Sequence, residues 1–278
     1  MIITIILIAM SFKVLFLGEV VGRAGILAVK NGLKALKDKV GADFVIANTE
    51  GATNGFGLGK AHSMQLSHLG INLQTGGEKI FYKLDMVDFF PKCSYVLRPA
   101  NFPPKTPGKG YKIVEINGKR VAIINILGAS GFSRICVVNP LNFADMILSK
   151  LSAEADIFLI QFHCATTAES ATLAHYLKDR VSAVISTHSK VLTSDSKIIG
   201  KCAFISDNGR CGSTLSAGGF NPEYEIKKLM TALPDRSHEA WEDCELQGVL
   251  VTISDDGNAE KIEVIKEKVA VERPEVSK

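Results

Sequence analysis

The sequence predicts an α/β fold in which two mixed β-sheets pack together and helices flank them. Short apolar runs alternate with helix-like stretches along both halves of the 278-residue chain. Each half also carries a hairpin signal, at Asn117-Gly118 and at residues 255–258. Alternating strands and helices are typical of parallel sheets, whereas hairpins add antiparallel strands. Two packed sheets flanked by helices account for both signals.

The first half of the chain begins with an apolar run that leads into a glycine-punctuated turn. Residues 24–39 predict a helix because Ile26, Leu33 and Leu36 form one apolar stripe. Residues 51–59 and 98–110 are rich in glycine or proline and predict loops. The other elements expected here are strands at 14–18, 44–48 and 72–75, helices at 62–69 and 79–90, and hairpin strands at 111–116 and 121–127.

The second half repeats the alternation and ends in a hairpin. The pattern predicts helices at 140–152, 167–178 and 222–232, and strands at 157–162, 181–186, 201–206, 246–253 and 261–269. Residues 11–270 are therefore expected to form one domain, followed by a flexible polar tail over 271–278. We expect residues 1–10 to be an artefactual or disordered extension, with translation starting at Met10. A weak membrane anchor is the alternative.

The composition narrows the classes of function. A net charge of +3, a single tryptophan and the lack of a basic stripe interleaved with aromatics give no nucleic-acid duplex signal. The six cysteines are scattered without a CxxC pair, so a reducing cytoplasm is expected rather than a disulfide framework. Lys13 interrupts the N-terminal apolar run before the roughly 18 residues that a membrane span needs, so no membrane partner is expected.

Four apolar runs each end in a residue that can bind a metal ion. These residues are Glu19, Glu50, His163 and His188. Because open α/β sheets build their sites beyond the carboxyl ends of their strands, residues distant in sequence can meet at one point. Two carboxylates and two imidazoles suit a divalent transition metal such as Mn, Fe or Zn.

Six segments, in order along residues 13–270, resemble motifs of the bacterial YmdB-type metallophosphoesterases in the calcineurin-like superfamily. They are GEVVGR at 18–23 (GDVVGR in the family), VIANTEG at 45–51 (VIANGEN), RPANFP at 98–103 (RPANYP), FHCATT at 162–167 (FHAEAT), THSKV at 187–191 (THTHV) and ISDNGRCG at 205–212 (ITDVGMCG). One such match alone would be weak evidence. Six in the family's order identify the chain as similar to this family.

The resemblance implies a four-layer αββα sandwich, in agreement with the periodicity. It also implies hydrolysis of a phosphodiester or nucleotide ligand, of the cyclic-nucleotide type, and a homo-oligomer. Two metals in the family share a bridging hydroxide that attacks phosphorus. A histidine beside a metal-binding asparagine is thought to act as the general acid.

The chain departs from the family pattern at five positions. Glu19 replaces the first aspartate and Gly51 replaces an asparagine. Gly77 and Glu78 replace the asparagine ligand and the acid histidine, and Lys190 replaces the second histidine of THTH. A charged lysine offers no lone pair to a metal. The resemblance therefore implies one divalent metal rather than two.

The residues at the family's site positions suggest which side chains bind metal, which are catalytic and which contact substrate. Glu50, His163 and His188 remain for one metal, and Glu78 lies beside the lost ligand. We expect Lys190 to replace the charge of the other metal by pairing with Glu19 or Glu50, so Glu78 and Lys190 are the candidate catalytic residues. The metal ligands by resemblance are Glu19, Glu50, His163 and His188. The candidate substrate contacts are Asn54, Arg98 and Asn101.

Two main hypotheses follow. The first is a metal-dependent phosphodiesterase whose activity is weak because a two-metal mechanism lacks part of its ligand set. The second is a catalytically inactive relative that uses the retained cleft to bind a nucleotide, a single metal or a protein partner. A purely structural role is a third reading, which no feature of the sequence supports directly.

Overall fold

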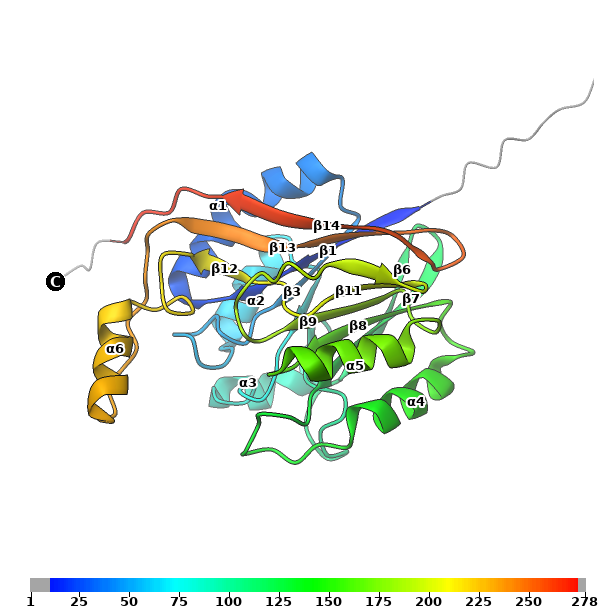
Figure 1. The fold of residues 1–278 in the computed structure, drawn as a ribbon, viewed down its shortest axis with the longest axis horizontal. Coiled ribbons are helices and arrows are strands. Elements are labelled where there is room, and N and C mark those ends of the chain that lie inside the picture. Colours follow the sequence, from blue (N-terminus) through cyan, green and yellow to red (C-terminus); the bar gives the residue numbers. More distant parts are fainter. Residues whose placement is uncertain (1–10, 275–278) are drawn as a thin grey trace, which may run out of the picture.

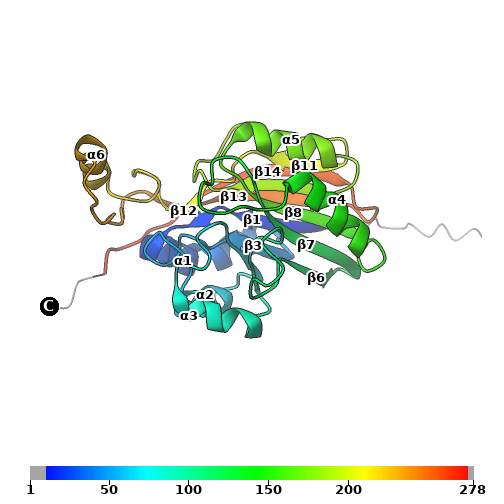
Figure 2. The ribbon, with the colours of Figure 1, turned by 90° about the horizontal axis from the view of Figure 1, so that it is seen from below.

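The computed structural model describes residues 11–274, which form two face-to-face sheets with helices on both outer surfaces (Figures 1 and 2). This arrangement confirms the αββα sandwich of two mixed sheets. The expected extension over residues 1–10 and the tail residues 275–278 lie outside the described residues. The domain boundary at 11–270 therefore stays a prediction.

The first sheet combines parallel and antiparallel strands. Its strands are β1 (Phe12–Leu17), β2 (Glu19–Val20), β3 (Phe44–Asn48), β4 (Leu73–Thr75), β5 (Val96–Leu97), β12 (Arg210–Ser213), β13 (Cys244–Ile253) and β14 (Ala259–Lys268). Strands β1, β3, β4 and β5 run parallel in that order. Strand β13 lies antiparallel to β1, β12 and β14, and β12 pairs in parallel with β2.

The second sheet has a parallel centre and antiparallel edges. Its strands are β6 (Tyr111–Ile116), β7 (Lys119–Leu127), β8 (Ile157–His163), β9 (Ala183–Thr187), β10 (Lys197–Ile199) and β11 (Cys202–Ile205). They follow the spatial order β10-β11-β9-β8-β7-β6. Because β7, β8 and β9 are parallel, their carboxyl ends share one edge of the sheet.

Alternation along β1 shows how the layers pack. Val14 and Phe16 join the apolar core between the two sheets, whereas Leu15 and Leu17 join the core beneath α1. The helices are α1 (Gly22–Val40), α2 (Lys60–His68), α3 (Leu84–Phe89), α4 (Pro140–Leu151), α5 (Thr167–Leu177) and α6 (Pro222–Thr231). Figure 2 shows α1, α2 and α3 covering one outer surface and α4 and α5 the other.

A close backbone crossing separates β1 from β2 and sets the position of Glu19. A β-carbon at Gly18 would lie 2.3 Å from the carbonyl carbon of Gly209, so only glycine fits there. The Glu19 amide donates to the Gly209 carbonyl at 3.0 Å. The turn expected over residues 18–22 thus contains the short strand β2 (Glu19–Val20).

The structure corrects the helix expected over residues 79–90. Residues 78–83 form turns, α3 begins only at Leu84, and a 3₁₀ turn (Phe90–Lys92) follows it. Here the amides of Ile80 and Tyr82 donate to the carbonyls three residues earlier, of Gly77 and Lys79, so the chain forms successive turns around the Glu50 carboxylate before α3 begins. The sequence analysis also missed β2, β5, β10 and β12, which span only two to four residues and are too short to show a periodicity.

Helix α6 differs from the other helices in Figure 1, because it projects away from the two sheets. None of its residues is buried. Within residues 11–274, no helix combines the length and the apolar character needed to cross a membrane.

Candidate metal centre

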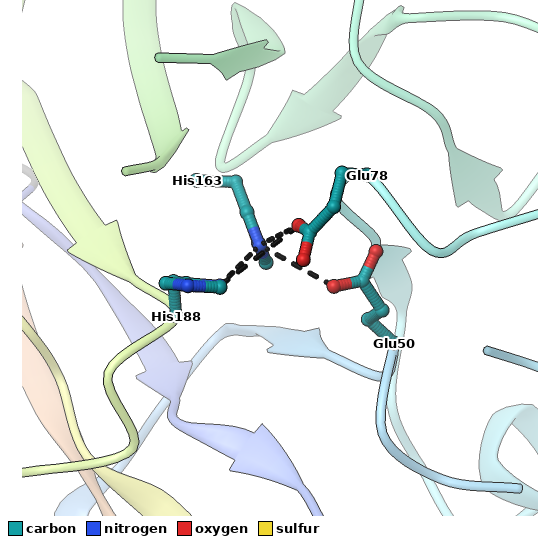
Figure 3. Close-up of side chains that lie close together, drawn as sticks. All are labelled: Glu50, Glu78, His163 and His188. Atoms are coloured by element: carbon teal, nitrogen blue, oxygen red, sulfur yellow. Dashed lines mark hydrogen bonds and ion pairs between the residues drawn. The ribbon is translucent and has the colours of Figure 1, made fainter. Parts of the chain in front are cut away.

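Four strand ends from the two sheets converge on one group of side chains (Figure 3). Glu50 follows β3, and Glu78 lies three residues beyond β4. His163 is the last residue of β8, and His188 directly follows β9. The first sheet thus supplies two carboxylates and the second sheet supplies two imidazoles.

The side chains of this group point toward one another in Figure 3. Each of Glu50, Glu78, His163 and His188 offers one ligand atom, and these atoms all lie within 4.8 Å of one another. His163 Nε2 lies 2.8 Å from Glu78 Oε2 and 3.3 Å from Glu50 Oε2. It also lies 2.9 Å from His188 Nδ1. We call these four residues the metal centre.

The backbone orients the Glu50 carboxylate. The amides of Gly77 and Lys79 donate to Glu50 Oε1 at 2.7 and 2.6 Å. The Glu50 amide itself donates to Asn48 Oδ1 at 3.0 Å. One oxygen is therefore held by the turn after β4, and the other is left facing His163.

Burial and mutual interactions shift the pKa values of all four side chains of the metal centre. Burial raises the pKa of Glu50 to about 7. Burial opposes protonation of His163, but the carboxylates of Glu50 and Glu78 outweigh it and raise the His163 pKa. Burial of Glu78 is outweighed by His163 and Lys79, which hold its pKa well below the usual range. Burial and the neighbouring His163 lower the pKa of His188 to about 3.

These residues fit a divalent metal ion. Glu78 Oε2 is buried without a hydrogen-bond partner, although it lies against both imidazoles. The 2.9 Å between His163 Nε2 and His188 Nδ1 is close to the ~3 Å that separates two ligands at right angles when metal–nitrogen bonds are about 2.1 Å long. Two carboxylates with two imidazoles are donors that Mn, Fe and Zn accept.

Glu19 lies beside the metal centre but outside the group of four. The Lys190 ammonium is 3.4 Å from Glu19 Oε1, which is one of the two pairings expected from the sequence, the other being with Glu50. Both side chains are largely buried. Asn48 Nδ2 lies 3.5 Å from Glu19 Oε2 and donates to Thr187 Oγ1 at 3.1 Å. The Lys190 ammonium therefore neutralises the buried carboxylate of Glu19. That this ammonium substitutes for a metal ion stays a prediction.

Two glycines explain how the departures from the family pattern fit together. A β-carbon at Gly51 would lie 2.4 Å from Glu19 Oε1. A β-carbon at Gly77 would lie 2.2 Å from His163 Nε2. The longer side chain of Glu19 and the ring of His163 thus fill the space that side chains at positions 51 and 77 would need. Of these two contacts, only that between Gly51 and Glu19 joins two departures, because His163 is retained from the family motif.

A cavity of about 530 Å³ opens beside the metal centre. Glu78, Lys79, Tyr82 and Phe132 are among the residues that line it. The Phe132 ring packs against both imidazoles, 5.1 Å from the ring of His188. Of these lining residues, only Glu78 was expected from the sequence; Lys79, Tyr82 and Phe132 were not. Lys79 could have been found by its place beside Glu78, but the 128–139 loop carries no pattern that marks Phe132.

The three candidate substrate contacts lie elsewhere. Asn54 is exposed at a cavity with Arg236. Arg98 is buried and donates to the carbonyl oxygens of its own loop. Asn101 donates to the carbonyls of Leu127 and Val138 and accepts from the Leu127 amide. The structure does not bring these three residues to the metal centre, and their contact with substrate stays a prediction.

The sequence comparisons agree with this geometry. A family model described as "YmdB-like protein" matches residues 15–265. The protein named 2′,3′-cyclic-nucleotide 2′-phosphodiesterase from Bacillus subtilis (strain 168) is 36% identical over 244 residues, which cover 87% of this chain and 92% of that protein.

Solved structures extend the comparison to the fold. A novel phosphatase from Mycoplasma pneumoniae superposes with a TM-score of 0.88 at 30% identity, covering 94% of this chain and 95% of that chain. A hypothetical protein from Thermus thermophilus gives a TM-score of 0.86 at 28% identity, with 93% and 100% covered. NAD nucleotidase from Haemophilus influenzae shares the fold at a TM-score of 0.58 and 14% identity, with 94% and 56% covered. The chain therefore belongs to the YmdB-like protein family, within the calcineurin-like phosphoesterase class.

Proposed function

We propose that this protein hydrolyses a phosphodiester with the help of a single divalent metal ion. The observation that carries the proposal is the convergence of Glu50, Glu78, His163 and His188 on one point. The Bacillus relative's name supports a 2′,3′-cyclic nucleotide as the class of substrate. A metal bound there would polarise a phosphoryl oxygen and take up charge that develops during hydrolysis.

Residues around the metal centre supply positive charge for the phosphate and aromatic surfaces for a nucleobase. Lys190 and Lys79 place two ammonium groups around the carboxylates, and these groups balance the negative charge that a phosphate adds. The cavity beside the metal centre offers aromatic walls from Phe56, Tyr82 and Phe132, on which a nucleobase can stack. Arg134 lines the same cavity and gives a further cation for the phosphate.

One observation favours a second candidate, an inactive relative that binds a nucleotide through the same cavity. Glu78 stands where the family has its acid histidine. His163 and Lys79 outweigh its burial and hold its pKa well below the usual range. A carboxyl group with a low pKa is a poor proton donor, so the leaving oxygen lacks the acid that the family supplies.

The first experiment is elemental analysis of protein purified without chelator, with hydrolysis of a bis-aryl phosphodiester and of 2′,3′-cyclic AMP measured in the same sample after adding Mn²⁺. We expect about one metal per chain, as the four-residue ligand set predicts, together with turnover. The absence of both metal and turnover would support the inactive relative. About two metals per chain with turnover would refute the proposed role of Lys190.

A matched pair of histidine variants assigns the activity to the metal centre. His163→Ala removes an imidazole that contacts both carboxylates, so we expect metal content to be lost and turnover to fall by ~10²-fold or more. His175→Ala changes an exposed histidine on α5 and should leave both measurements unchanged. Equal turnover in the two variants would exclude the metal centre as the active site.

A further inference from the structure

A second cavity, of about 810 Å³, lies between α4 and the segment that runs from the 98–110 loop into β6. Its volume is within the range of small-molecule binding sites. It shares no lining residue with the cavity beside the metal centre. Neither the proposed hydrolysis nor the metal centre gives it a role.

One part of this second cavity is apolar. Phe102, Phe143 and Ile147 are buried side chains that line it. Val138 and Met146 line it as well, and their exposed fractions are 53% and 56%. Exposed apolar side chains beside a concave apolar wall mark a surface that an apolar ligand can cover.

The other part of the second cavity is cationic. Lys109, Lys112 and Lys150 line it, and no aspartate or glutamate does. Within residues 11–274, none of these three lysines has a carboxylate within ion-pair distance. The Lys150 ammonium lies 5.4 Å above the Tyr111 ring, which also lines the cavity. Several like charges without counterions produce a positive potential in this concave space.

Arg98, which is buried and positively charged, also lines the second cavity. Only 8% of this residue is exposed. Its guanidinium donates to the carbonyl oxygens of Pro99, Ala100 and Thr106, none of which carries a formal charge. Its Nε is buried without a hydrogen-bond partner. A buried cation without an anionic partner is costly, so an anion entering the cavity would relieve an existing imbalance.

We propose that this second cavity binds an amphipathic anion, a small molecule with an apolar or aromatic body and one carboxylate, sulfonate or phosphate group. The body contacts Phe102, Phe143 and Ile147, and the anionic group faces Lys112 and Lys150. The inference stands on the cavity's shape and charge alone. It does not depend on the proposed hydrolysis, because the two cavities are separate.

Two fluorescent probes test the proposal on the full chain. 1-Anilinonaphthalene-8-sulfonate carries an aromatic body and a sulfonate, whereas N-phenyl-1-naphthylamine has nearly the same body without the charge. We expect the sulfonate to bind with a stoichiometry of about one per chain and ~10-fold or more tighter than the neutral probe. Equal affinities, or no sulfonate binding up to about 1 mM, would overturn the proposal.

Charge-reversal variants locate the bound probe. Lys112→Glu and Lys150→Glu should each weaken sulfonate binding by ~10-fold and leave binding of the neutral probe unchanged. Lys30→Glu makes the same charge change at an exposed position on α1 and should have no effect. Loss of sulfonate binding in Leu229→Gln, on the exposed apolar surface of α6, would place the probe there and refute the assignment.

Discussion

Among single residues, three replacements of family residues, Lys190, Glu19 and Gly51, are linked by contacts through Glu19. The ammonium of Lys190 faces Glu19, and Glu19 in turn fills the space beside Gly51. Restoring the asparagine at position 51 alone would require the Glu19 carboxylate to move, because a β-carbon there would lie 2.4 Å from Glu19 Oε1. A histidine at position 190 would face a carboxylate that is one methylene too long for the original arrangement.

The coupled replacements predict the behaviour of a triple variant. Glu19→Asp, Gly51→Asn and Lys190→His together restore the family residues at these three positions, including the shorter carboxylate and the second histidine, and remove the competing ammonium. We expect the metal content in elemental analysis to rise from about one to about two per chain.

The single variant Lys190→His serves as the control for the triple variant. It should stay at about one metal per chain, because Glu19 still occupies the space beside Gly51. A second metal in the single variant would show that the three positions act independently.

Among the helices and strands, the strongest local signals gave the expected structures. Asn117 and Gly118 have φ angles of 47° and 79°, and they join β6 and β7 in the antiparallel hairpin that the dipeptide predicted. The helix expected at 79–90 was wrong in its first half, where the amides of Ile80 and Tyr82 donate three residues back and form turns beside the Glu50 carboxylate. An apolar pattern carries no information about a carboxylate that is distant in sequence.

Helix α4 offers a test of local stabilisation on the wall of the second cavity. Asn139 caps its first turn, and the Asn139 side chain accepts hydrogen bonds from the amides of Leu141 and Asn142. We expect Asn139→Ala to lower the free energy of unfolding by about 1 kcal/mol, measured by urea denaturation. Asn142→Ala, an exposed change in the same turn, should lower it by much less. Equal losses in the two variants would contradict a capping role.

For the molecule as a whole, Asp207 links folding to pH. Its side chain accepts from the amides of Ser189 and Gly209 in a buried position after β11. Burial raises the pKa of Asp207 to about 7. The folded protein therefore holds this proton more tightly than the unfolded chain does. The stability contribution is complete below the unfolded pKa of about 3.9 and is lost as the pH rises toward 7.

Replacing Asp207 tests this linkage. In wild-type protein with chelator present, we expect the free energy of unfolding to fall by about 3 kcal/mol between pH 4 and 7 through this group. Asp207→Asn should flatten that part of the profile, whatever its effect on absolute stability. The exposed change Asp38→Asn should retain the wild-type slope. An unchanged slope in Asp207→Asn would assign the pH dependence to other groups.

The metal centre is itself a property of the whole molecule, because the two sheets contribute to it equally. Glu50 and Glu78 follow strands of the first sheet, and His163 and His188 belong to strand ends of the second. Apolar runs ending in chemically suitable residues predicted three of these four as metal ligands without any coordinates. Glu78 was expected nearby only because of its place in a family motif.

Local patterns in the chain were enough to predict the layer order and the strand ends where chemistry occurs, because the alternation of apolar residues and the position of a strand's last residue are local properties. They could not decide whether Lys190 pairs with Glu19 or with Glu50, or show that Arg98 bonds to its own loop and Asn101 to the carbonyls of Leu127 and Val138. Those outcomes depend on distances of a few ångströms between segments far apart in the chain. Such distances are set by how the two sheets pack, which no local pattern encodes.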